Sequence, residues 1–539
     1  MGDTTMKTTR RRVLQGGVAA ASLATFGIRT RRSWGQSGGV VRFVPHGDVR
    51  SLDPIWTTAN MSAYHGAMVF DTLFGIDADL QPKPQMVDTW EVSEDQLTYK
   101  FVLREGLKWH DGTPVTAEDC VASLYRWAAR DGGGQHMMRR MKEIVPTGEN
   151  SFEFRLNEPY GLVIDVLAKT STPICYMMRQ EEAATDPNEQ VTEMIGSGPF
   201  RFVADEWVPG SKLVYERNPD YVPRNEPASG MAGGKVVHIE RAEWNIMPDP
   251  QTAMAALQAG EIDFFEIPPL DLIDILKADP NIKVEVLNKL GNVGQIRLNH
   301  LHPPFDKVEA RRAMLHLVNQ EDYMRACIGN PDYYQICGSQ FTCGSPMEND
   351  AGLEWMEGAP NVELAKELLE KAGYDGRAVV VLQPTDIPIL SNAALVTAQL
   401  LRSADVNVDV AASDWGGVVT RRAVKAPVEE GGWNIFHTWA GGNAQSSPIN
   451  LSAHAATGEN AWFGWPEDAR HEELRDAWAA APTLEERQEI ARQLQENSYR
   501  IVTQCIFGQW VSPVAYRDTL SDIVAIPEVI PFWNMKKSA

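Results

Sequence analysis

Residues 361–410 read NVELAKELLEKAGYDGRAVVVLQPTDIPILSNAALVTAQLLRSADVNVDV, and their pattern decides the fold class. Asn361 is placed to cap a helix that runs to Ala372, because its side chain can accept a hydrogen bond from the first turn. Leucines recur on one face of this helix, as in a helix packed against a core. Gly373 is a typical residue for ending it.

A strand, a second helix and another strand are predicted to follow. Residues 378–382 are apolar without interruption, residues 386–403 have helical periodicity, and residues 406–410 alternate between apolar and polar. A strand–helix–strand unit of this kind builds a parallel pair of strands with a right-handed crossover. The sequence therefore predicts an α/β protein.

Other elements can be predicted locally. Residues 253–259 favour a short helix, which Thr252 can cap and Gly260 can end. Residues 94–105 alternate as in a half-buried strand. Thr483 has the spacing of a capping box before a long helix.

Length and charge narrow the possible functions. The chain has 539 residues, of which 43% are hydrophobic and 23% charged, which indicates two or three packed units. Its formal net charge is −22. Such a charge repels phosphate backbones and anionic lipids, so we expect neither nucleic acid nor a membrane surface as a partner.

The N-terminus has the features of an export signal. Residues 9–15, TRRRVLQ, resemble the twin-arginine motif, and the apolar stretch over residues 13–28 is too short to span a bilayer comfortably. Residues 33–35 offer small side chains for cleavage. We therefore predict a signal peptide over residues 1–36 and a soluble protein in the periplasm, with a basic tail as the alternative. No cysteine follows the leader to carry a lipid anchor.

Six cysteines are present, and none forms a C-x-x-C pair. Cys337 and Cys343 flank a short loop, and an exported protein meets oxidising conditions. We expect a disulfide between them, and two reduced or separately paired thiols are the alternative. The absence of the commonest zinc spacings argues against a metal site.

The most distinctive stretch is residues 87–119, VDTWEVSEDQLTYKFVLREGLKWHDGTPVTAED. It resembles the signature of the peptide-type (family 5) extracytoplasmic solute-binding proteins, the relatives of dipeptide- and oligopeptide-binding proteins. Further matches follow in the family's order and cover nearly the whole mature chain: residues 52–54, 196–200, 218–221, 257–263 and 298–313.

This resemblance implies the class II periplasmic-binding-protein fold. Two lobes close over a ligand in the cleft between them, and an extra subdomain is attached to the first lobe. The expected boundaries are residues 37–70, 190–291 and 506–539 for the first lobe, 71–189 for the extra subdomain and 292–505 for the second lobe.

The resemblance also implies ligand-binding residues. The segment containing Asp414 and Trp415 is similar to one whose tryptophan lines the cleft, and Trp439 is similar to a second such tryptophan. Asp386 falls where relatives present a ligand-contacting side chain at a strand end. Core packing is the alternative for each tryptophan.

One departure from the family concerns the ligand. Peptide binders of this family carry an aspartate in the loop after the second tryptophan, where it pairs with the α-ammonium group. Residues 439–448, WAGGNAQSSP, contain no carboxylate. Asn443 can offer only a neutral amide, which binds an ammonium group more weakly than a carboxylate does. Asp386 or Asp414 would then have to supply the charge.

The predicted function is capture of a small solute for an ABC importer, with a short peptide or another small polar or amphipathic molecule as ligand. The partners are that solute and the permease subunits in the membrane, and the protein is expected to be a monomer. No catalytic residue, cofactor or metal is predicted. A binding protein for a sensor or chemoreceptor and an exported hydrolase are the alternatives.

Several histidines are candidates for catalysis or metal binding. His110 lies beside Asp111, and His300 and His302 precede two prolines. We interpret the first as a turn histidine and the other two as surface or hinge residues. Gly196-Ser197-Gly198 does not have the spacing of a nucleophile elbow.

Overall fold

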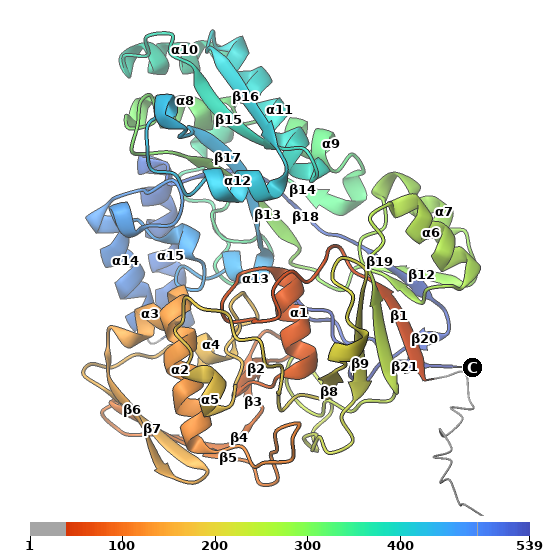
Figure 1. The fold of residues 1–539 in the computed structure, drawn as a ribbon. Helices are drawn as coiled ribbons and strands as arrows, with labels where there is room; N and C mark the ends of the chain where they lie inside the picture. The colour runs from red at the N-terminus through yellow and green to blue at the C-terminus, as the bar shows by residue number, and fades with distance from the viewer. Residues whose placement is uncertain (1–38, 482, 539) are drawn as a thin grey trace, which may run out of the picture. The chain divides into compact units, whose positions relative to one another are not determined.

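The structure is a computed structural model that describes residues 39–481 and 483–538. The signal peptide predicted over residues 1–36 lies outside them. Two large sheets dominate the described chain (Figure 1). We call them the first sheet and the second sheet, in the order in which the chain enters them.

The first sheet has seven strands, in the order β12-β19-β11-β1-β10-β9-β8. Their bounds are β1 Val40–Val44, β8 Phe200–Phe202, β9 Lys212–Arg217, β10 Arg241–Asn245, β11 Phe264–Phe265, β12 Ile282–Glu285 and β19 Val514–Arg517. Strand β1 is parallel to both of its neighbours, β10 and β11. The carboxyl ends of these three strands therefore share one edge.

The second sheet has six strands, in the order β14-β18-β13-β17-β15-β16. Their bounds are β13 Asn292–Leu298, β14 Tyr334–Gln335, β15 Val379–Pro384, β16 Val408–Ser413, β17 Ile435–Gly441 and β18 Cys505–Trp510. Strands β15, β16 and β17 are parallel, and β13 runs antiparallel to β17 and β18. The ends of β15, β16, β17 and β18 thus lie at one edge, beside the start of β13.

A four-stranded antiparallel sheet, in the order β4-β5-β7-β6, lies within residues 71–189. The smaller strands and this sheet have the bounds β2 Phe74–Ile76, β3 Pro82–Pro84, β4 Val87–Val92, β5 Thr98–Leu103, β6 Met141–Gly148, β7 Ser151–Leu156, β20 Leu520–Ser521 and β21 Lys536–Lys537. Tyr99, Phe101 and Leu103 alternate inward, as predicted for residues 94–105.

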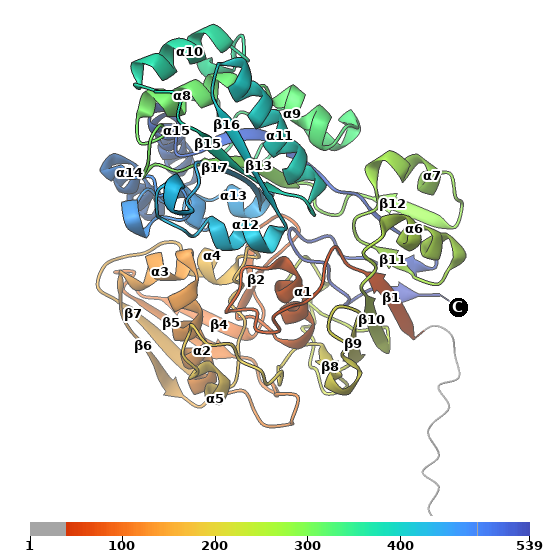
Figure 2. The same ribbon diagram turned by 45° about the horizontal axis from the view of Figure 1, so that its top comes forward.

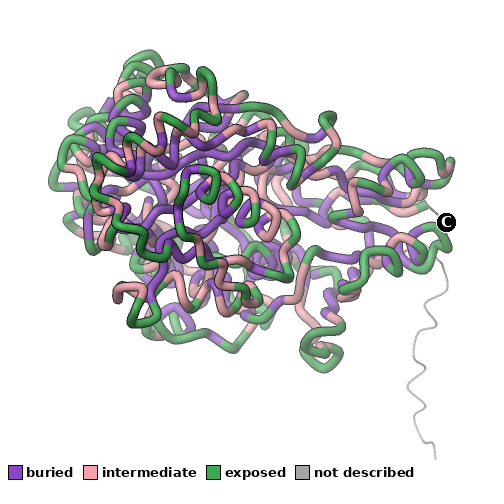
Figure 3. The backbone as a smooth tube through the Cα atoms, turned by 90° about the horizontal axis from the view of Figure 1, so that it is seen from above, coloured by how far each residue is buried: buried purple, intermediate pink, exposed green. Residues whose placement is uncertain are grey.

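The helices cover these sheets (Figure 2). Many of the buried residues lie in the strands and on the helix faces that pack against them, in the interior of the molecule (Figure 3). The bounds of the helices are α1 Asn60–Val69, α2 Ala117–Arg130, α3 Gly132–Met138, α4 Val163–Ala168, α5 Gln180–Ala183, α6 Pro250–Ala259, α7 Ile273–Lys277, α8 Val308–Leu317, α9 Gln320–Cys327, α10 Val362–Lys371, α11 Pro388–Ser403, α12 Trp415–Arg421, α13 Gly442–Gln445, α14 Ala469–Ala480 and α15 Leu484–Ile501.

The predicted strand–helix–strand unit is confirmed. Asn361 caps α10 by accepting a hydrogen bond from the Leu364 N–H, and β15, α11 and β16 follow in the predicted order. Strands β15 and β16 are parallel neighbours. Thr483 also caps α15 as predicted, through the Glu486 N–H.

One detail of the prediction is wrong. Asp249, not Thr252, caps α6, because Pro250 occupies the first helical position and needs no N–H partner there. Strand β18 extends to Trp510 and pairs with β13 and β14 of the second sheet.

An ion pair without solvent exposure joins the start of the described chain to α2. Arg126 Nη2 lies 2.7 Å from Asp53 Oδ2, and both side chains are 0% exposed. Asp53 also accepts hydrogen bonds from the backbone of Ile55, Trp56 and Val191. The carboxylate therefore ties two backbone segments, one at residues 55–56 and one at residue 191, to one arginine.

We predict that Asp53→Asn lowers the free energy of unfolding by about 3 kcal/mol, because it leaves a buried guanidinium without its counter-charge. Urea denaturation measures the change. The control is Asp375→Asn, which breaks the exposed pair of Asp375 with Arg377 and should cost far less stability, because solvent screens that pair. Equal losses in the two variants would contradict this account.

Candidate functional site

The five residues predicted to bind ligand follow strands of the second sheet at one edge. Asp386 follows β15, Asp414 and Trp415 follow β16, and Trp439 and Asn443 lie at the end of β17. Because adjacent strands lie about 4.8 Å apart, the ends of three neighbouring strands occupy one small region. In open α/β sheets, ligands bind outside the carboxyl ends of strands.

Asp386 and Asp414 both hold the start of α12. Asp386 Oδ1 accepts a hydrogen bond of 2.7 Å from the Trp415 N–H, and Asp414 Oδ1 accepts one of 2.8 Å from the Gly417 N–H. Both aspartates are exposed, and Trp415 is half-buried. The two carboxylates thus hold the backbone of the first turn of α12, which carries Trp415.

Trp439 and Asn443 make contacts of different kinds. The Trp439 ring packs edge-on against Trp510, with their centres 5.9 Å apart. Asn443 Nδ2 donates a hydrogen bond of 3.0 Å to Thr170 Oγ1, a residue just beyond α4. The side-chain amide of Asn443 is therefore already hydrogen-bonded to Thr170, a residue distant in the sequence.

The first sheet presents polar groups at its own edge. His46 follows β1 and Glu266 follows β11, and the His46 backbone N–H donates a 2.7 Å hydrogen bond to Glu266 Oε2. The imidazole Nδ1 lies 2.8 Å from Oε1 of the same carboxylate. Tyr64, on α1, donates its hydroxyl to Oε1 at 2.9 Å. No local sequence pattern marks these residues, because only the pairing of β1 with β11 brings them together.

The pKa of His46 is raised. Burial alone lowers the pKa of this imidazole, but the charge and the hydrogen bond of Glu266 more than offset that effect. Burial raises the pKa of the Tyr64 hydroxyl well above its usual value, and the Glu266 and Glu528 carboxylates raise it further. Tyr64 is thus a neutral hydroxyl between two acidic groups.

A third carboxylate meets the loop that follows Trp439. Glu528 Oε1 accepts a hydrogen bond of 3.0 Å from the Ala444 N–H. Burial raises the pKa of Glu528, while backbone N–H groups of this loop and the charge of Lys169 oppose that shift. Nothing in the local sequence around Glu528 indicates such a role.

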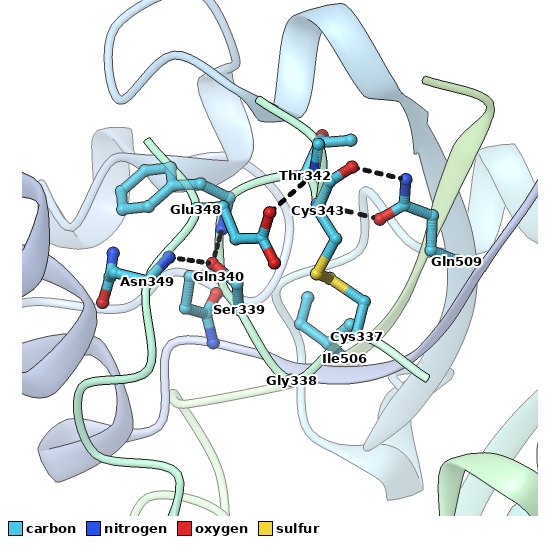
Figure 4. The surroundings of a disulfide bond; sticks show 12 residues. Cys337, Gly338, Ser339, Gln340, Thr342, Cys343, Glu348, Asn349, Ile506 and Gln509 are labelled. Atoms are coloured by element: carbon cyan, nitrogen blue, oxygen red, sulfur yellow. Dashed lines mark hydrogen bonds between the residues drawn. A yellow bond between two sulfur atoms is a disulfide. The ribbon is translucent and has the colours of Figure 1, made fainter. Parts of the chain in front are cut away.

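Cys337 and Cys343 form a disulfide (Figure 4). Gln509 on β18 accepts a hydrogen bond from the Cys343 N–H and donates one to the Cys343 carbonyl. Between the two cysteines, Thr342 donates its hydroxyl to the Gly442 carbonyl, and the Gln340 carbonyl accepts from Gln445. The disulfide-closed loop is therefore hydrogen-bonded to the loop that follows Trp439.

The histidines considered for chemistry have structural partners. His110 is hydrogen-bonded to the backbone of Gly196 and Gly198, and His302 to the Lys425 carbonyl. His300 is partly buried, and its burial lowers the pKa of the imidazole well below the usual value. Among the residues that the structure describes, no three His, Cys, Asp or Glu side chains are grouped to hold a metal ion.

Residues 81–462 match a known family, the bacterial extracellular solute-binding proteins, family 5. The chain belongs to this family. It is 45% identical over 490 residues to a probable peptide ABC transporter periplasmic-binding protein of Sinorhizobium fredii, covering 90% of this chain and 91% of that protein. The resemblance noted from the sequence is thereby confirmed.

Solved structures with low sequence identity share the fold. The agropinic acid complex of a periplasmic binding protein from an Agrobacterium has a TM-score of 0.78 at 19% identity, covering 93% of this chain and 99% of that one. The Met-Leu complex of a Pseudoalteromonas dipeptide-binding protein has a TM-score of 0.75 at 18% identity, covering 93% of this chain and 100% of that one. The chain thus has the two-lobed fold predicted for it.

Family membership also decides the broad function. The family consists of solute-binding proteins that serve ABC importers, and binding, not catalysis, is what its members have in common. In the part of the chain that is described, no helix is both long and apolar enough to cross a membrane.

The pair formed by His46 and Glu266 predicts a pH dependence. Because the folded-state pKa of His46 is raised, its contribution to stability is complete below the unfolded pKa of about 6.5 and is lost as pH rises through the folded value. His46→Gln should therefore cost about 1 kcal/mol more at about pH 5.5 than at about pH 9, measured by urea denaturation.

His110 provides the control for this measurement. Burial lowers its pKa to about 4, so His110 destabilises the folded protein as pH falls below about 6.5. His110→Gln should show a pH trend of the opposite sign. Parallel trends in the two variants would contradict the assignment of the His46 effect to Glu266.

The disulfide predicts a response to reductant. Cleaving a loop this short should lower the free energy of unfolding by about 2 kcal/mol, because the unfolded chain regains conformational freedom. Denaturation with and without a phosphine reductant measures this loss. The double variant Cys337→Ser/Cys343→Ser should be insensitive to the reductant, and a further loss in that variant would show that another bond is responsible.

Proposed function

We propose that this protein is exported to the periplasm, binds one small solute between the facing edges of the first and second sheets, and delivers it to the permease of an ABC importer. The observation that carries the proposal is the grouping of aromatic and polar side chains at these two edges, in a chain that belongs to a solute-binding family. A group of side chains of this composition is suited to a small polar or amphipathic molecule.

Export is proposed to use the twin-arginine leader of residues 1–36, and the mature protein is proposed to act as a soluble monomer without a lipid anchor, cofactor or metal. No covalent chemistry is proposed. The hydrogen bonds of His110 and His302 to backbone carbonyls support the proposal that these histidines have structural roles and take part in no covalent chemistry.

The lobes are proposed to follow the two large sheets. Residues 37–70, 190–291 and 511–539 then form the first lobe, 292–510 the second, and 71–189 the extra subdomain. Placing the last boundary after Trp510 follows from the pairing of β18 in the second sheet.

The ligand is proposed to be a short peptide or another small solute that contacts Trp415 and Trp439. The name of the Sinorhizobium relative refers to peptides, and the Agrobacterium structure contains agropinic acid. Asp386, Asp414 and Asn443 are proposed to border the solute. Because all three already bond to the protein, they are expected to orient the site more than to neutralise ligand charge.

The proposal is tested by thermal-shift screening of small peptides, amino acids and organic acids, followed by calorimetry and X-ray scattering. A binding solute should raise the melting temperature and reduce the radius of gyration as the lobes close. Trp415→Ala and Trp439→Ala should each weaken binding roughly tenfold or more, because each removes a large aromatic contact surface.

Trp90→Ala is the matched control, because Trp90 is an exposed tryptophan of β4, in the segment assigned to the extra subdomain. Its affinity should equal that of the wild type. If the screen yielded no stabilisation and no compaction, the proposed function would be refuted. If both cleft variants bound as tightly as Trp90→Ala, the position of the site would be wrong.

A further inference from the structure

Glu528 places a carboxylate beside the loop of residues 439–448, whose own sequence contains no Asp or Glu. It lies in the C-terminal segment, outside the sequence of residues 439–448, yet its side chain packs against that loop. Its Oε1 accepts the Ala444 N–H, and the Asn443 N–H lies close enough to stabilise the same carboxylate. The anion is therefore held by the backbone that directly follows Trp439.

Gly441 makes room for this carboxylate. A side chain on Gly441 would collide with the Oε1, Cδ and Cγ atoms of Glu528. The glycine lies two residues after Trp439 and therefore points to the same side of β17. The Glu528 carboxylate and the Trp439 ring thus belong to the same face of the strand end.

The charge of Glu528 has no partner of its own. Among the residues that the structure describes, no lysine, arginine or histidine lies within 4.0 Å of its carboxylate, the distance that defines an ion pair. The nearby Lys169 is held by Asp131, with Nζ 2.5 Å from Oδ2. Glu266 differs from Glu528 in this respect, because it is paired with His46.

The surroundings of Glu528 suit a cation with an apolar body. The Glu266 and Glu528 carboxylates both raise the pKa of the Tyr64 hydroxyl. Tyr64, which contacts the edge of the first sheet through Glu266, therefore also lies near Glu528. Trp439 offers an aromatic surface, and aromatic faces attract cations. A half-buried carboxylate without a cation is costly until a ligand provides one.

We propose that Glu528 receives an ammonium or other cationic group of the solute, in the role that the loop of residues 439–448 cannot fill. This inference rests on the proposed function and specifies its substrate class as small molecules with a free amine, peptides with an unblocked N-terminus included. The cation forms charge-assisted hydrogen bonds with a carboxylate already fixed by backbone N–H groups.

The test uses dipeptides, amino acids and diamines, each paired with its N-acetylated form, together with neutral sugars and organic acids that lack an amine. Thermal shift identifies the best free-amine ligand, and calorimetry measures the affinities of its pair. In the wild type, N-acetylation should weaken binding by about 30-fold or more. Glu528→Gln should weaken the free amine similarly and abolish the preference over the acetylated form.

Two further variants complete the design. Glu528→Asp keeps the charge and should retain a preference for the free amine, which a merely structural role would not predict. Asp522→Asn removes an exposed carboxylate of the same C-terminal segment, paired with Lys536, and should bind like the wild type. Melting of each variant without ligand reports whether it folds.

The outcomes separate this inference from the proposed function. Binding of solutes without a cation in preference to amines, or an undiminished amine preference in Glu528→Gln, would overturn the inference and leave solute binding intact. Failure of the wild type to bind any compound would refute the proposed function first. If Glu528→Gln did not fold, the wild-type acetylation pair and Glu528→Asp would still decide the question.

Discussion

Two short connections between the large sheets constrain everything else in this protein. Residues 286–291 lead from the end of β12 to the start of β13, and residues 511–513 lead from the end of β18 to the start of β19. Fully extended, they span at most about 25 Å and about 14 Å. The edges they join must therefore lie opposite one another, and these are the edges that carry His46, Glu266 and Trp439.

This constraint explains why the proposed binding site lies between these edges. At the carboxyl ends of parallel strands, side chains and backbone groups have no further strand partner. The connections over residues 286–291 and 511–513 bring one such edge of the first sheet and one of the second sheet together. Contacts between distant segments already exist beside this region, such as Asn443 with Thr170 and Ala444 with Glu528. A solute that added contacts to both sides would favour the closed arrangement, which is how binding drives lobe closure.

The sequence predicts those features of the fold that depend on residues close together in the chain. Asn361 and Thr483 were identified as caps because a capping side chain acts within three residues, and the β15–α11–β16 unit because its periodicities are regular. Thr252 was the wrong cap for α6 because the choice between neighbouring candidates depends on where Pro250 begins the helix. The end of β18 could not be predicted, since its length is fixed by pairing with β13, more than 200 residues away in sequence.

The residues of the candidate site likewise fall into those that the sequence suggests and those that only the fold brings together. Trp415 and Trp439 could be proposed from family resemblance, whereas the Glu266 contact with His46 joins residues 220 positions apart and the Glu528 contact with Ala444 joins residues 84 apart. No periodicity or spacing encodes such contacts. The missing loop carboxylate was visible in residues 439–448, but its replacement from the C-terminal segment appears only when the chain is folded.

The most direct test of the account is a crystal structure of the protein purified from its own periplasm, with native mass spectrometry of the same preparation to identify any retained solute. The account predicts a small molecule between the two edges, in contact with Trp415 or Trp439. A solute retained elsewhere on the chain, with these tryptophans packed only against protein, would contradict it.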